Sequence, residues 1–196
     1  AGVIVKPVQI EKALVTAEPP EGFKPGDAVT FKLKMCIPSG DTKSIEFKDF
    51  LPSPIFKANS VFNVALTQSP NVGATVTSTA NLTDNSIKFT INPTVISINP
   101  TQVVCLEVTF SVLVTTDPFA DNLFLTNLFQ SKTLNTQGTE ETHLTGVVIH
   151  VRAPKLKITK GVFSSDNPNA VVSPTPPPSQ PDPPVDGNLT GADAGD

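Results

Sequence analysis

The chain has 196 residues, of which 38% are hydrophobic and only 16% charged, and it contains 20 prolines but no tryptophan or tyrosine. This composition favours strands and turns over helices, in one domain with appendages. The formal net charge of −4 is unlike that of nucleic-acid-binding proteins, which carry clustered lysine and arginine. The longest apolar runs are far shorter than the roughly 18–20 residues that a membrane-spanning helix needs, so we expect no membrane insertion.

The charge is distributed unevenly along the chain. All 14 lysines and arginines lie at or before Lys160, whereas five of the 18 acidic residues follow it. The acidic tail of one copy could therefore lie against the body of another, although a solvated tail is the alternative. The first residues lack the basic and long apolar regions of a signal peptide, which predicts a mature or excised chain.

Alternation of apolar and polar residues predicts about eight strands. Residues 29–36 alternate strictly after a turn at Pro25-Gly26-Asp27. No window has a helical apolar stripe longer than two turns, so a sandwich of two antiparallel sheets is the expected fold. The other predicted strands, separated by breaks rich in Pro, Asn, Gly or Asp, cover residues 44–50, 61–67, 74–79, 86–91, 103–114, 124–129 and 146–151.

One strand pairing is predicted in register. If residues 29–36 and 104–114 pair antiparallel so that partner numbers sum to 141, Phe31 faces Phe110 and Lys34 faces Glu107. The same register places Cys36 opposite Cys105, the only two cysteines. An even number of cysteines in an apparently secreted chain favours a disulfide, which would stabilise the fold by roughly 4 kcal/mol on the chain-entropy model. Two free thiols are the alternative.

The two ends of the chain resemble each other. Residues 8–14 match residues 156–162 at an offset of 148, and a proline precedes each segment. The chain therefore reads as one domain flanked by pieces of neighbouring repeats. We expect a strand or linker shared with a preceding repeat or subunit at 1–6, the sandwich at 7–152, and a strand or linker to the next repeat or subunit at 153–172. A Pro-rich polyproline II acidic tail is expected at 173–196.

Four segments resemble a known family. They are Pro25–Phe31, Phe47–Pro52, Thr126–Phe129 and Pro154–Lys160. In order and spacing they resemble the tandem Ig-like "conserved repeat" domain of unknown function found in cell-surface and fimbrial proteins. The resemblance covers about Pro7 to Lys160 and implies an extracellular Ig-like sandwich of about 7–9 strands, used as a structural or adhesive module without an active site. The cysteine pair and the Pro-rich insert depart from the family.

Some related fimbrial domains join strands by an isopeptide bond between a lysine and an asparagine. A buried carboxyl group polarises the amide, and a desolvated, neutral lysine attacks it. The matching positions here are Lys12 and Asn127, with Asp49 or Glu46 as the acid. Alternation places Lys12 on the same face as Ile10 and Leu14; a lysine that extends to water near a strand end is the simpler interpretation.

The Pro-rich tail predicts an extended spacer, because proline fixes φ and removes the backbone donor. It also resembles the hydroxyproline-rich wall glycoproteins of algae and plants, with a bare disordered linker as the alternative. Two sequons, at Asn81 and Asn188, permit N-glycosylation if the source is a secretory eukaryote, with chance occurrence in a chain rich in Thr and Asn as the alternative. The candidates for hydroxylation or O-glycosylation are Ser173, Pro174, Thr175, Pro176, Pro177, Pro178, Ser179, Pro181, Pro183 and Pro184.

The sequence contains little that indicates a catalytic, metal or cofactor site. The two histidines, His143 and His150, have no cysteine or acid at metal-ligand spacing, and Asp27 and Asp49 lie near turn prolines where aspartate usually bonds to local backbone. We therefore expect neither an enzyme nor a resident cofactor or metal.

The predicted function is that of a structural subunit of an extracellular filament or surface array. Copies of the chain, or adjacent repeats, would join head to tail by terminal strand exchange and through the Pro-rich tail. The preferred donated segment is Pro154–Phe163, with Leu156, Ile158 and Val162 on its apolar face, and Val3–Leu14 is second. A stalk module that binds glycans or receptors is the alternative.

Overall fold

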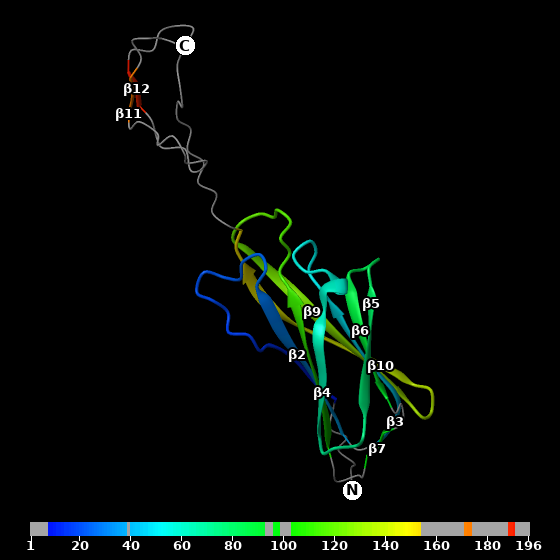
Figure 1. Ribbon diagram of the computed structural model, residues 1–196. Helices are drawn as coiled ribbons and strands as arrows, with labels where there is room; N and C mark the ends of the chain where they lie inside the picture. The colour runs from blue at the N-terminus through cyan, green and yellow to red at the C-terminus, as the bar shows by residue number, and fades with distance from the viewer. Residues whose placement is uncertain are drawn as a thin grey trace. The chain divides into compact units, whose positions relative to one another are not determined.

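The computed structural model describes residues 8–38, 40–92, 96–98, 103–153, 171–173 and 188–190 (Figure 1). The chain divides into two compact units, Ala1–Pro154 and Lys155–Asp196. In the second unit, β11 (Val171–Ser173) pairs antiparallel with β12 (Asn188–Thr190). The candidate sites whose geometry is described below all belong to the first unit.

The first unit consists of two antiparallel sheets, and thus confirms the predicted all-β sandwich. The smaller sheet has the order β1-β2-β8-β4, and the larger has the order β10-β9-β3-β6-β5 with β7 paired to β3. The elements are β1 (Gln9–Leu14), β2 (Ala28–Ile37), β3 (Gly40–Phe50), the short 3-10 helix η1 (Ala58–Ser60), β4 (Phe62–Ser69), β5 (Thr75–Asn81), β6 (Ser86–Asn92), β7 (Ile96–Ile98), β8 (Val104–Leu113), β9 (Leu123–Asn135) and β10 (Glu140–Val151).

The predicted register of β2 and β8 is confirmed. Phe31 pairs with Phe110, Lys34 with Glu107, and Cys36 with Cys105. A disulfide joins the two cysteines on the outer side of the smaller sheet. The same alternation directs every second side chain of β2 into the space between the sheets, where it is buried.

Aromatic and branched aliphatic side chains from both sheets form the core. The Phe31 and Phe110 rings lie 5.7 Å apart, and the Phe47 and Phe129 rings meet edge to face at 5.2 Å. Leu33, Met35, Ile45, Ile55, Phe56, Phe89 and Ile91 are among the other large side chains that are fully buried.

Strands β9 and β10 are longer than the sequence patterns predict. The prediction stopped at Phe129 and resumed at Gly146, but pairing continues to Leu134 opposite Glu140, around a turn that contains Gly138. The inward positions in this extension include Ser131 and Thr133, which are buried but polar. Alternation of hydrophobicity therefore disappears although the strands continue.

The chain enters and leaves the sandwich at opposite ends. Strand β1 starts beside Cys36 and finishes beside Phe31, whereas β10 starts at the turn after β9 and finishes at Val151. Only two residues connect β2 to β3, and β9 finishes beside the start of β3, so β1 and β10 start at the same end and run in the same direction. The two strands are neighbours across the sheets, and Phe23 forms a parallel bridge to Val151.

Candidate functional site

A buried lysine–carboxylate pair connects the two sheets. Lys12 lies on β1 of the smaller sheet, and its ammonium group forms a salt bridge with Asp49 on β3 of the larger one. Both side chains are completely shielded from solvent. Lys12 Nζ also donates to the Leu128 carbonyl at 3.4 Å and lies 5.1 Å from the centre of the Phe31 ring. The simpler interpretation of Lys12, a side chain that extends to water, is therefore wrong.

Asn127 on β9 completes this site, which we call the Lys–Asp–Asn cluster. Its side chain is fully buried, and neither amide atom has a hydrogen-bond partner among the described residues. One oxygen of Asp49, Oδ1, is likewise without a partner in that part of the chain. Unpaired buried polar atoms are rare in folded proteins and are costly to stability. Three such atoms in one cluster therefore require an explanation.

Burial shifts the pKa values of Lys12 and Asp49 in the directions that favour their neutral forms. Desolvation lowers the pKa of Lys12 from 10.5 to about 8, although the negative charge of Asp49 and its hydrogen bond oppose this shift. Desolvation also raises the pKa of Asp49, against the opposing effects of Lys12 and, more weakly, Asn127. The lowered pKa of Lys12 increases the fraction of neutral amine at pH 7, and the neutral amine is the nucleophilic form.

The structure distinguishes between the two acids that the sequence offered for this site. Asp49 faces inward with Ile45 and Phe47, whereas Glu46 faces outward and lies 3.5 Å from Lys88. Glu46 is therefore wrong as the acid of the cluster. The expectation that Asp49 bonds to local backbone is also wrong, but it holds for Asp27, which accepts a hydrogen bond from the Lys24 backbone at 2.8 Å.

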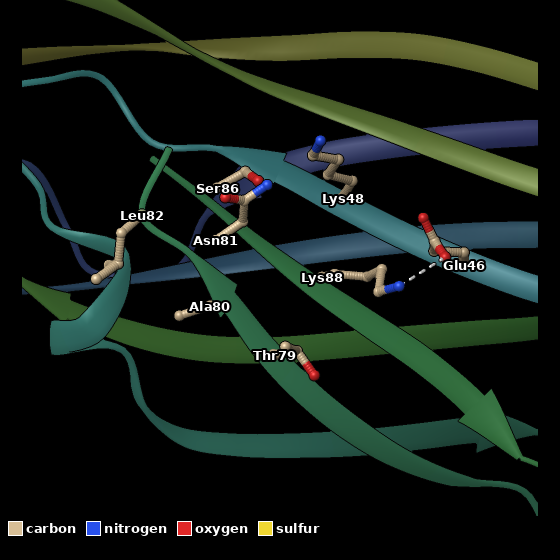
Figure 2. Close-up of a pocket in the computed structure, with 8 residues that line it drawn as sticks. All are labelled: Glu46, Lys48, Thr79, Ala80, Asn81, Leu82, Ser86 and Lys88. Carbon is tan, nitrogen blue, oxygen red and sulfur yellow. Dashed lines mark ion pairs between the residues drawn. The ribbon is translucent and has the colours of Figure 1, made fainter. Parts of the chain in front are cut away.

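A polar groove of about 460 Å³ lies on the outer face of β3, β6 and β5. Its lining residues come from these strands and from the turn between β5 and β6 (Figure 2). They are Glu46, Lys48, Thr79, Ala80, Asn81, Leu82, Ser86 and Lys88.

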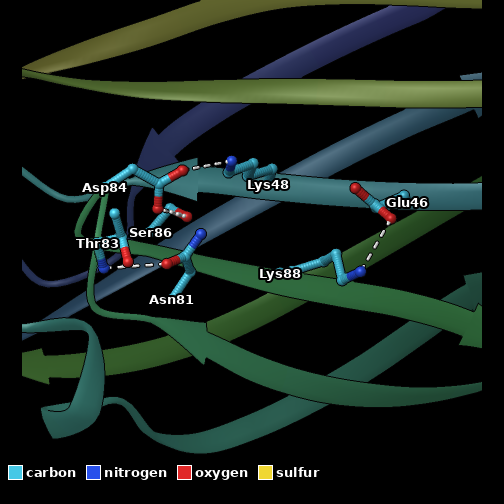
Figure 3. Close-up of polar contacts among 7 residues, drawn as sticks. All are labelled: Glu46, Lys48, Asn81, Thr83, Asp84, Ser86 and Lys88. Atoms are coloured by element: carbon cyan, nitrogen blue, oxygen red, sulfur yellow. Dashed lines mark hydrogen bonds and ion pairs between the residues drawn. The ribbon is translucent and has the colours of Figure 1, made fainter.

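Ion pairs and hydrogen bonds order this groove. Lys48 Nζ lies 2.6 Å from Asp84, which also accepts a hydrogen bond from Ser86 (Figure 3). Asn81, one of the two predicted glycosylation candidates, is exposed at the end of β5, and its Oδ1 accepts a hydrogen bond from the Thr83 backbone at 3.0 Å. The groove was not predicted, because it depends on side chains from three strands that are distant in sequence.

An exposed apolar row lies on the outer face of β9 and β10. It consists of Phe124, Leu128, Leu144 and Val148, and Phe124 is 67% exposed. The Phe124 ring stacks on His150, with the ring centres 4.3 Å apart. His150 in turn is hydrogen-bonded to Asn122 at 2.8 Å.

Most of the predicted tail and donor sites lie outside the described residues. This applies to Leu156, Ile158, Val162 and the Pro-rich positions from Pro174 onward. Ser173 and Asn188 belong to β11 and β12, respectively, but their side chains are not described. In the described part of the chain, no helix is long and apolar enough to cross a membrane, and no group of three potential ligands is placed to hold a metal.

Comparison with solved structures finds major pilins. BcpA, the major pilin subunit of Bacillus cereus, matches with a TM-score of 0.53 and 12% identity over 80% of this chain and 41% of BcpA. The full-length major pilin SpaD from Corynebacterium diphtheriae matches with a TM-score of 0.53 and 20% identity over 73% of this chain and 34% of SpaD. This chain therefore spans less than half of either pilin, and the likeness shows a shared Ig-like sandwich fold.

A separate match covers domains D2 and D3 of SpaD. It has a TM-score of 0.52 and 19% identity, over 71% of this chain and 51% of that fragment. Comparisons with protein-family models and with curated protein sequences find no match.

Proposed function

We propose that this chain is a structural subunit of an extracellular filament or surface array, in which copies join head to tail through their terminal segments. The observation that carries the proposal is the path of the chain, which enters the sandwich at one end and leaves it at the other. Tension between neighbouring copies would pull β1 and β10 in opposite directions along their length. The fold that this chain shares with major pilins supports the same role.

The terminal segments are the proposed connectors. The alternating positions Leu156, Ile158 and Val162 would give the C-terminal segment an apolar face that another copy could bind. The acidic residues after Lys160 would favour contact with the more basic body of a neighbour.

Truncation tests the head-to-tail proposal. Three purified chains, ending at Asp196, Phe163 and Arg152, are compared by negative-stain microscopy and light scattering. We expect filaments from the chain ending at Asp196 and only monomers from the chain ending at Arg152. The chain ending at Phe163 keeps the proposed donated strand but lacks the Pro-rich tail, so it shows which of the two is needed. Filaments from the chain ending at Arg152 would exclude the C-terminal segment as the connector.

We also propose that the Lys–Asp–Asn cluster forms an amide bond between Lys12 and Asn127. The neutral Lys12 amine attacks the side-chain carbonyl carbon of Asn127, and the protonated Asp49 carboxyl donates to the carbonyl oxygen. The new carbon–nitrogen bond replaces the original one, and the amide nitrogen of Asn127 leaves as ammonia with the proton lost by Lys12. The shielded Lys12–Asp49 pair and the unpaired amide of Asn127 support this assignment.

Intact-mass measurement tests the bond directly. We expect denatured, unreduced protein without attached sugars to weigh about 17 Da less than its sequence requires, after allowing for the disulfide. The deficit should disappear in Lys12→Met, Asn127→Ala and Asp49→Asn, and persist in Glu46→Gln, whose side chain faces outward. A full sequence mass in the unsubstituted protein would overturn the covalent assignment but leave the filament proposal untouched.

The exposed apolar row favours a second candidate function, that of an adhesive stalk module. Four large apolar side chains on one sheet face provide a contact surface, and the stacked Phe124 and His150 rings supply a flat element of the kind that sugars recognise. Binding of the monomeric sandwich to a glycan array, with loss of binding in Phe124→Ser, would favour this function over assembly.

A further inference from the structure

We propose that Asn81 is N-glycosylated and that the attached sugar lies in the polar groove, where it covers the open edge of the larger sheet. The inference requires the extracellular location of the proposed function but does not depend on filament assembly. It combines three observations: the accessibility of Asn81, the groove beside it and the exposure of β5.

The sequon is presented on an accessible turn. Asn81 is the last residue of β5, the chain reverses over the next four residues, and Leu82 at the turn is 68% exposed. The hydrogen bond from the Thr83 backbone to Asn81 Oδ1 fixes the amide plane. Figure 3 shows the amide nitrogen of Asn81 on the side away from Thr83, and the residue as a whole is exposed.

The modification is a glycosyl transfer from a polyprenyl-diphosphate-linked oligosaccharide, catalysed by a transferase of the secretory route. The amide nitrogen of Asn81 attacks the anomeric carbon of the first sugar, and a carbon–nitrogen bond forms. The bond from that carbon to the diphosphate oxygen breaks, polyprenyl diphosphate leaves, and the amide nitrogen loses one proton. The sequon Asn81-Leu82-Thr83 supplies the acceptor that this chemistry requires.

The groove provides a place for the attached sugar. Asn81 forms part of its wall, and a volume of about 460 Å³ lies within the range of small-ligand sites. The lining offers the Thr79 hydroxyl, the ammonium groups of Lys48 and Lys88 and the Glu46 carboxylate (Figure 2). Sugar hydroxyls can accept hydrogen bonds from the ammonium groups and donate to the carboxylate, so the first sugar would remain against the sheet.

The sugar would protect the open edge of β5. Among the described strands, β5 pairs only with β6, and all of its residues except Val76 are exposed. Its sequence, TVTSTAN, contains none of the lysine or proline residues that usually protect an edge from pairing with another chain. A sugar at Asn81 would block the approach of a second strand to this edge.

Peptide mass spectrometry of the full chain from its native cells tests the site. Trypsin releases residues 58–88 as one peptide, in which Asn81 heads the only sequon. We expect a sugar mass on this peptide, and conversion of Asn81 to aspartate when an amidase removes the sugar. An unmodified peptide would overturn the inference, even if filaments form.

Hydrogen exchange and light scattering test the location of the sugar. We expect enzymatic removal of the sugar to reduce the exchange protection of residues 75–81, and Thr83→Ala to self-associate more than Thr83→Ser, which retains the sequon. Equal exchange and equal association would overturn the groove and edge assignment. Because the enzymatic comparison starts from folded protein that carries Thr83, a folding defect of Thr83→Ala would not affect it.

Discussion

Lys12 and Asp49 show how alternation along a strand can place charged residues in a core. Lys12 shares its face with Ile10 and Leu14, and that pattern alone predicts its inward direction. Asp49 has the same parity as Ile45 and Phe47, so its burial could also be predicted. Its nearness to Pro52 instead suggested a turn. The orientation of Asn127 into the same space depends on how the sheets face each other, which no local pattern contains.

The lowered pKa of Lys12 predicts a specific dependence of stability on pH. Below a pH of about 8 the folded state must bury a charged Lys12, whereas above 10.5 the amine is neutral in both states. The unfolded state binds more protons between these values, so stability should rise with pH across this window, by roughly 3 kcal/mol at most.

Urea unfolding over this pH range measures the effect. The background is Asn127→Ala, in which Lys12 cannot form the amide bond and remains titratable. We expect its free energy of unfolding to rise from pH 8 to 10.5 relative to the double variant Lys12→Met/Asn127→Ala, in which Lys12 no longer titrates and groups outside the cluster titrate as before. Parallel pH profiles for the two proteins would show that burial does not lower the pKa of Lys12.

At the scale of elements, the connection between β1 and β2 is fastened to β10 by close backbone contacts. The Phe23 backbone donates to the His150 carbonyl at 2.9 Å, and the Arg152 backbone donates to the Phe23 carbonyl at 2.8 Å. Gly22 directly precedes this bridge with a φ of +83°, and a Cβ atom there would lie 2.9 Å from the His150 carbonyl oxygen. The fastening therefore requires glycine for both its conformation and its size.

Gly22→Ala is expected to destabilise the protein more than Gly26→Ala does. Both positions have a positive φ, which costs an alanine about 1–2 kcal/mol, but a Cβ at Gly26 meets no atom within 4 Å. The additional loss of unfolding free energy in Gly22→Ala, measured by chemical denaturation, reports the close contact of this position with β10. Equal losses would mean that the connection shifts away from β10 at no cost.

Considered as a whole molecule, the sandwich was largely predictable because both faces of β2 and β8 carry informative residues. The apolar pairs, the Lys34–Glu107 pair and the two cysteines all agree on one register. The lengths of β9 and β10 were not predictable, since Ser131 and Thr133 occupy inward positions that usually hold apolar side chains. The groove and the apolar row arise from the arrangement of strands in the sheet, which short motifs do not encode.

The disulfide should stabilise the whole domain. It joins residues 69 apart in sequence and therefore restricts the unfolded chain, by about 4 kcal/mol on the chain-entropy model. We expect the double variant Cys36→Ser/Cys105→Ser to lose a free energy of this order in urea unfolding, while its circular dichroism in water remains that of a β-protein. A loss below about 1 kcal/mol would show that the unfolded chain is already restricted by other means.

The opposite placement of the entry and exit points also limits how this sandwich can be rearranged. A circular permutant would need a new linker from the end of β10 back to the start of β1, along the full length of the larger sheet. Strand β10 has 12 residues, so at about 3.3 Å per residue the linker would have to span roughly 40 Å. The domain is thus suited to a tandem array, in which each copy spaces its neighbours apart. It is poorly suited to insertion within a loop of a host protein, where the two ends must be close.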